Sequence, residues 1–269
     1  MQSNSLWLGR LRGPVKTLMI VFVGLTLALY VYLILNKIFV ADAYGMHEMI
    51  RPAGRPIVQA MLALLSLSIL FASIFLSDTK GAIETPPDGV FDLVSVVLGR
   101  LAMIMTAFIV LVMFYEVVSR YVFSKPTLWA NELSLWIASF VFLLAGLYAM
   151  QQRSHIRIYI IYDMMPRWAQ KASDLLSVLL IVFFTFALVW GGYTDAENRF
   201  MRMETFGTAW DPPLPGIVKP ALLIIVVMVC LQAVSNLIAD WNKAPATHTP
   251  MDEIDESEIE NIRRTLEEK

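Results

Sequence analysis

The stretch from residue 56 to residue 76 decides the fold class, and it reads PIVQAMLALLSLSILFASIFL. It contains no charged side chain, and its length matches the roughly 20 residues that an α-helix needs to cross the hydrocarbon core of a bilayer. Ser77 and Asp78 follow it, and there we expect the chain to return to water. The stretch therefore predicts a membrane-spanning α-helix.

Five further apolar stretches have the same character, and they cover residues 17–36, 93–115, 132–151, 174–193 and 217–239. Of the whole chain, 57% of residues are hydrophobic and 16% are charged, whereas soluble domains are roughly 45–50% apolar and about 25% charged. The sequence therefore predicts an all-α, polytopic integral membrane protein with six transmembrane helices. We expect the first stretch to be retained, because it is longer than the roughly 7–15 apolar residues of a cleaved signal peptide.

Lysine and arginine predict the orientation, because cytoplasmic loops carry an excess of both. If the N-terminus is inside, 13 of the 21 basic residues lie on the cytoplasmic side and 8 lie outside. The clearest contribution comes from residues 152–173, which hold four basic residues and one acid, Asp163. The distribution favours an orientation in which both termini are cytoplasmic.

The remaining composition excludes several classes of function. The formal net charge of -2 provides no general basic surface for nucleic acid. The histidines, His47, His155 and His248, fall in predicted loops or the tail, so no pair of axial haem ligands is expected within the bundle. Cys230 is the single cysteine and cannot form an intrachain disulfide or a cysteine metal cluster. Zinc and phosphate-binding motifs are also missing, so we predict no cofactor and no metal.

Ionisable residues gather at the ends of the predicted helices. Glu116 and Arg120 are four residues apart on one helical face. Glu132 begins the fourth stretch, where the helix dipole favours a carboxylate. We expect Arg120 to face both acids and to fasten two helix ends, and the alternative is a relay or a substrate clamp. Arg100, near the start of the third stretch, is expected to reach the lipid headgroups with its long side chain.

Weakly polar residues occur within the stretches, whereas prolines lie in loops and at the ends. The main polar examples are Gln59, Ser66, Ser139 and Gln232. We interpret them as contacts that let membrane helices pack closely. The interrupted helices that mark a midplane transport site are not expected. The alternative is a stand-alone carrier or channel with a polar path through these four side chains.

An ordered series of motifs in the second half of the chain is similar to a known family. Residues 116–123 read EVVSRYVF, 129–134 read WANELS, 153–158 read RSHIRI and 210–215 read WDPPLP. Together they resemble the small membrane subunit of tripartite ATP-independent periplasmic (TRAP) transporters. The resemblance covers about residues 90–240. It divides the chain into two additional N-terminal helices (1–88), a four-helix core (89–242) and an acidic cytoplasmic tail (243–269).

The resemblance implies a division of labour. In such transporters a periplasmic binding protein captures the substrate, usually an organic acid, and a large membrane subunit carries the substrate and sodium sites. The small subunit is a non-catalytic companion that widens the static scaffold in the bacterial inner membrane. The implied partners are the large subunit, the binding protein and phospholipids. The other alternative is a membrane enzyme that uses Glu116, Arg120 and Glu132 at an outer-leaflet site.

Two interaction surfaces follow from this interpretation. The loop at 194–216 is a candidate docking surface for the binding protein, and the alternative is that its aromatic side chains anchor in lipid headgroups. The candidate docking residues are Phe200, Met203, Phe206 and Trp210. A basic stretch on the cytoplasmic side is expected to touch anionic lipid headgroups. Its residues are His155, Arg157 and Arg167.

Overall fold

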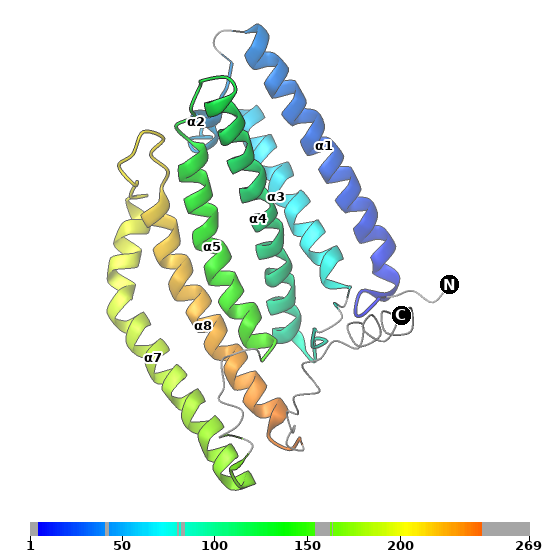
Figure 1. The fold of residues 1–269 in the computed structure, drawn as a ribbon, viewed down its shortest axis with the longest axis vertical. Helices are drawn as coiled ribbons and strands as arrows, with labels where there is room; N and C mark the ends of the chain where they lie inside the picture. Colours follow the sequence, from blue (N-terminus) through cyan, green and yellow to red (C-terminus); the bar gives the residue numbers. More distant parts are fainter. Residues whose placement is uncertain are drawn as a thin grey trace, which may run out of the picture.

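The computed structural model describes residues 5–243, apart from residues 41–42, 80, 82–83, 154–161 and 163. Six long helices dominate this described part of the chain (Figure 1). They are α1 (Arg12–Phe39), α3 (Pro56–Ser77), α4 (Val90–Tyr121), α5 (Ala130–Gln151), α7 (Arg167–Met201) and α8 (Leu214–Asp240). A short 3-10 helix (Gly9–Leu11) precedes α1, and the short helix α2 (Met46–Met49) lies between α1 and α3. The described part of the chain contains no β-strand.

The six predicted spans are confirmed, and each of them lies within one long helix. All six helices are long and apolar enough to cross a membrane. The helices extend beyond the apolar stretches, and α7 does so most. It has 35 residues, which corresponds to a length of about 52 Å at 1.5 Å per residue. Polar residues at both ends of α7 continue the helix, because helical hydrogen bonding does not stop where the apolar stretch stops.

The helices form a row in which each packs mainly against its neighbours (Figure 1). The order across the row is α1, α3, α4, α5, α8 and α7, and α4 also contacts α8. The edge helices are α1 and α7. On α7, large apolar side chains such as Phe183 and Trp190 remain exposed. Exposed apolar surface of this extent is typical of a face that meets lipid or another membrane subunit.

The bundle has a proximal end and a distal end. The proximal end holds Arg12, where α1 begins, and Asp240, where α8 ends. The distal end holds Phe39, where α1 ends, and Leu214, where α8 begins (Figure 1). Helices α1 and α3 are called the N-terminal pair.

Small and weakly polar residues let neighbouring helices approach closely. Thr26 Oγ1 lies 2.8 Å from Ser68 Oγ, which joins α1 to α3 within the apolar part of the bundle. Gly99 of α4 lies directly against the ring of Tyr148 on α5, so that an added β-carbon would collide with the ring. Such contacts hold membrane helices together, where lipid removes most of the hydrophobic driving force.

Proline placement differs from expectation at one position. Pro220 lies inside α8, in its second turn, and not at the end of the helix. A proline there removes only one backbone hydrogen bond close to the start of the helix. The middle of each described span has no proline, as expected.

Candidate functional sites at the two ends of the bundle

Glu116 lies at the centre of a charged site at the distal end. Its side chain is almost fully buried in the last turns of α4. Arg120 donates to Glu116 Oε1 through Nε at 2.9 Å and through Nη2 at 2.5 Å. The backbone N–H of Thr127 donates to Oε2 at 3.0 Å, and the hydroxyl of Thr127 binds the same oxygen. Glu116 thereby fastens the end of α4 to the segment before α5, a role for Thr127 that no spacing pattern in the sequence indicated.

The expected bridge from Arg120 to Glu132 does not form. Glu132 Oε1 instead accepts a hydrogen bond from the backbone N–H of Trp210 at 3.4 Å. The indole Nε1 of Trp210 donates to the carbonyl of Met46 at 2.9 Å, and the indole ring packs edge-on against Trp136. Glu132 therefore fastens α5 to the loop between α7 and α8.

The four candidate docking residues fall into two groups. Trp210 is 4% exposed. Its side chain therefore packs on the inner side of the loop and does not contribute to the outer surface. Phe200, Met203 and Phe206 are each about half exposed. Docking of a partner on these three side chains stays a prediction.

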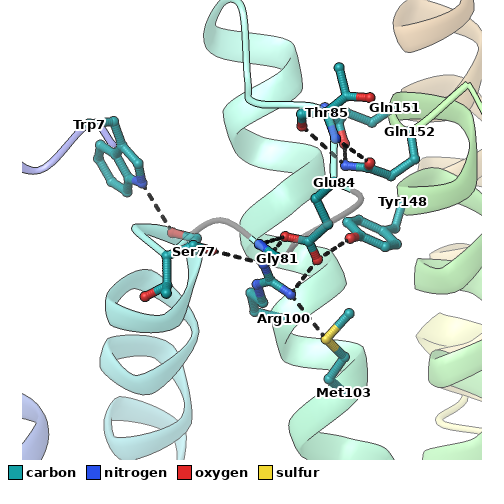
Figure 2. A network of polar contacts seen from close by, with 11 residues as sticks. Trp7, Ser77, Gly81, Glu84, Thr85, Arg100, Met103, Tyr148, Gln151 and Gln152 are labelled. Atoms are coloured by element: carbon teal, nitrogen blue, oxygen red, sulfur yellow. Dashed lines mark hydrogen bonds and ion pairs between the residues drawn. The ribbon is translucent and has the colours of Figure 1, made fainter. Parts of the chain in front are cut away.

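A partly buried ion-pair network occupies the proximal end of α4 and α5 (Figure 2). Glu84, in the segment before α4, pairs with Arg100 and accepts a hydrogen bond from the hydroxyl of Tyr148 at 2.6 Å. Arg100 also donates to the carbonyl of Thr79 at 3.0 Å. The Arg100 side chain is 12% exposed. The expectation that Arg100 reaches the lipid headgroups is therefore wrong, because an acid from the preceding loop already binds its guanidinium.

The surroundings of Glu84 favour its charged form. Burial raises the pKa of Glu84, but hydrogen bonds from Arg100, from Tyr148 and from the backbone N–H of Gly81 lower it to about 2 overall. Thr85, next in the chain, donates its backbone N–H to Gln152 Oε1 at 2.8 Å (Figure 2). The segment between α3 and α4 is thus bound to both α4 and α5.

Asp78 holds the N-terminal segment at the proximal end of α3. Its side chain is fully buried and accepts hydrogen bonds from the backbone N–H groups of Trp7 and Leu8 at 2.8 and 2.9 Å. The hydroxyl of Ser5 donates at 2.9 Å, and Arg12 lies at 3.1 Å. Burial raises the pKa of Asp78, and these donors with the charge of Arg12 lower it by more.

A buried polar cluster joins α4, α8 and α5. Gln232 Nε2 donates to Asp92 Oδ1 at 2.6 Å, and the hydroxyl of Ser95 donates to Gln232 Oε1 at 2.8 Å. Asn236 Nδ2 donates to the carbonyl of Met150 at 2.7 Å. Because these groups satisfy one another, the cluster fits the packing role expected for Gln232.

The four side chains suggested for a carrier path do not lie along one route. Gln59 and Ser66 are exposed on the surface of α3. The hydroxyls of Ser66 and Ser139 bind carbonyls of their own helices, while Gln232 belongs to the buried cluster. The described residues also contain no group of His, Cys, Asp and Glu able to hold a metal ion.

Arg167 is the one residue of the predicted basic stretch that the structure describes. It begins α7 and donates to the carbonyl of Lys243 at 2.6 Å. His155 and Arg157 lie outside the described residues. Nearby, Arg153 pairs with Asp240 at 2.5 Å and connects the end of α5 to the end of α8. Contact of the basic stretch with lipid headgroups therefore stays a prediction.

At most of these sites a charged side chain at the end of a long apolar helix binds another group of the same chain. The partner is an opposite charge at Asp78, Glu84, Glu116 and Asp240, and a backbone N–H at Glu132. The arrangement defines a multi-pass membrane protein whose polar groups hold helices in place. Residues 109–243 match the family described as tripartite ATP-independent periplasmic transporters, DctQ component. The chain belongs to this family, and it is a component of a TRAP transporter. Comparison with curated proteins and with solved structures gave no match.

Proposed function

We propose that the chain is the non-catalytic small subunit of a sodium-coupled TRAP transporter that imports an organic acid. Its partners are the large membrane subunit, which carries the substrate and sodium, a periplasmic binding protein, and phospholipids. The family match supports this role. The observation that carries it is that the ion pairs at the helix ends, such as Glu84–Arg100 and Glu116–Arg120, form between residues of this chain, with the acid of each pair largely buried. A transport site needs polar groups that remain available to a ligand.

The proximal end faces the cytoplasm of a bacterial inner membrane, which the excess of lysine and arginine near this end supports. Residues 1–88 supply the N-terminal pair, residues 89–242 form the four-helix core, and residues 243–269 form an acidic cytoplasmic tail. The exposed apolar faces of the edge helices contact the large subunit and lipid.

Two smaller surfaces belong to the same proposal. At the distal end, which faces the periplasm, Phe200, Met203 and Phe206 contact the binding protein. At the proximal end, the basic stretch with His155, Arg157 and Arg167 contacts anionic headgroups.

Reconstitution tests the division of labour. Proteoliposomes are prepared with this chain, the large subunit and the binding protein, and uptake of a radiolabelled organic acid is measured with and without a sodium gradient. We expect uptake to require all three components and the gradient, and this chain by itself to give none. Uptake by this chain alone would instead support the stand-alone carrier.

A further inference from the structure

The segment between α1 and α3, here called the loop of the N-terminal pair, lies against the loop between α7 and α8 at the distal end. The indole of Trp210 donates to the carbonyl of Met46 at 2.9 Å, and Arg51 Nη2 lies 3.8 Å from Asp211 Oδ2. Trp210 and Asp211 fall within the residues that match the family, whereas Met46 and Arg51 precede them. A segment outside the family match therefore covers the tryptophan that supports the α7–α8 loop.

The α7–α8 loop is held in one conformation. Met203, Gly207 and Asp211 have φ angles of 45°, 78° and 59°, and a residue other than glycine keeps such a backbone only where its surroundings fix it. The backbone N–H of Gly207 donates to Asp211 Oδ1 at 2.8 Å, and that of Phe206 donates to the carbonyl of Pro212 at 3.0 Å. A loop that is fixed in advance loses less conformational entropy when a partner binds.

Three arginines at the distal end are more exposed than the acids with which they pair. The pairs are Arg51–Asp211, Arg120–Glu116 and Arg202–Glu204. In this order the arginine side chains are 57%, 50% and 71% exposed, and the acids are 27%, 4% and 34% exposed. At these three pairs the positive charge is the more exposed partner, whereas at Arg199–Asp195 the acid is the more exposed, at 49% against 28%.

We propose that the N-terminal pair completes a docking surface at the distal end that binds an acidic surface of the periplasmic binding protein. Its exposed arginines are Arg51, Arg120 and Arg202, and its exposed apolar side chains are Phe200, Met203 and Phe206. Arginine, methionine and aromatic residues are enriched in protein interfaces, and opposite charges accelerate the encounter of two partners. The inference rests on the proposed function, because that function places the binding protein at this end.

The test measures how the soluble binding protein, carrying a fluorescent label, associates with the whole transporter in nanodiscs of phosphatidylcholine. The double variant Arg51→Gln/Arg202→Gln removes two charges from the surface. We expect it to lower the association rate constant about three- to tenfold at low ionic strength. At 1 M salt, where the Debye length is about 3 Å, the difference should nearly disappear.

Two further variants make the comparison specific. The matched control Arg10→Gln/Lys16→Gln removes two exposed charges near the proximal end and should leave the association rate unchanged. The variant Arg51→Lys/Arg202→Lys retains the charge and should retain the rate. Co-purification with the large subunit establishes that each variant has folded and assembled.

An unchanged association rate in the double variant, with normal binding by the unaltered transporter, overturns the inference and leaves the proposed function intact. Absence of binding to the unaltered transporter overturns the binding protein as a partner. An effect that appears only in nanodiscs with added phosphatidylglycerol assigns the arginines to anionic lipid and also overturns the inference.

Discussion

At the residue scale, the carboxylate of Glu84 connects a loop to two helices through its charged form. Its pKa of about 2 compares with 4.5 for an unperturbed glutamate, with Arg100 and Tyr148 as the main donors. Because the pKa is lower in the folded protein, the stability that it contributes is present above about pH 4.5 and is lost as the pH falls toward 2. We expect Glu84→Gln to lower the free energy of unfolding at pH 7 by about 1–3 kcal/mol.

Thermal unfolding in detergent between pH 7 and pH 3 measures this effect. The difference between the variant and the unaltered chain should shrink as the pH falls. Glu197→Gln, at an exposed position on α7, is the control and should have little effect. A difference that stays constant over this range would show that charge on Glu84 does not stabilise the fold.

Two glycines provide a second residue-scale comparison. At Gly99 an added β-carbon would collide with the ring of Tyr148, whereas at Gly146 it would meet open space. Although alanine is the better helix former, we expect Gly99→Ala to destabilise the chain by about 1–3 kcal/mol, because overpacking forces helices apart. Gly146→Ala should be neutral or stabilising. Thermal unfolding of the isolated chain in detergent measures both, and equal effects would contradict close packing at Gly99.

The sequence placed ionisable residues at helix ends and paired Glu116 with Arg120, but it did not identify the partners that come from loops. Glu116 and Arg120 could be paired from their spacing, because one helix determines their geometry. Arg100 could not be paired with Glu84, because Glu84 lies in a loop whose path depends on α3 and α5. Glu132 was misassigned for the same reason, since the backbone group that it binds belongs to Trp210 in a distant loop.

At the element scale, the spans were predictable because the thickness of the bilayer sets their length and their apolar character. The ends of α4 and α7 were less predictable, because polar residues continue these helices past the apolar stretch. The loops were the least predictable elements. Trp210 was expected at a docking surface, but contact with Met46 in the loop of the N-terminal pair buries it.

Contact between these two loops should slow the exchange of their backbone amide hydrogens with solvent. Trp210→Phe keeps an aromatic ring but removes the donor to Met46. Hydrogen–deuterium exchange should therefore become faster in both the segment 43–55 and the segment 202–213, because each loop helps to hold the other. Trp190→Phe, at an exposed position on α7, is the matched control and should change neither segment. Faster exchange in one segment alone would contradict mutual support.

At the scale of the whole molecule, the N-terminal pair is connected to the core at both ends of the bundle. Glu84 connects it at the proximal end, and Met46 and Arg51 connect it at the distal end. Between these ends α3 packs along α4. The division at residue 88 that the family resemblance suggested therefore separates sequence segments that are joined in space.

The connections at the two ends should let the protein assemble from two separately produced fragments. Membrane helices form individually and then associate through packing and hydrogen bonds, so residues 1–88 and 89–269 should assemble when they are produced as two chains. Recovery of the first fragment with an affinity-tagged second fragment measures the association. Glu84→Gln in the first fragment and Trp210→Phe in the second should each lower recovery. Failure of the unaltered fragments to co-purify would contradict the two connections.

The two substitutions together give the sharper measurement, because α3 has 22 residues and therefore separates the two ends by about 33 Å. Sites this far apart that share no partner should act independently, so their effects on the free energy of association should add to within about 0.5 kcal/mol. A combined effect no larger than the greater single effect would mean that loss of one connection already releases the other. Additive effects would mean that each end of the bundle holds the N-terminal pair separately, so that the distal loops can be altered without loosening Glu84 at the proximal end.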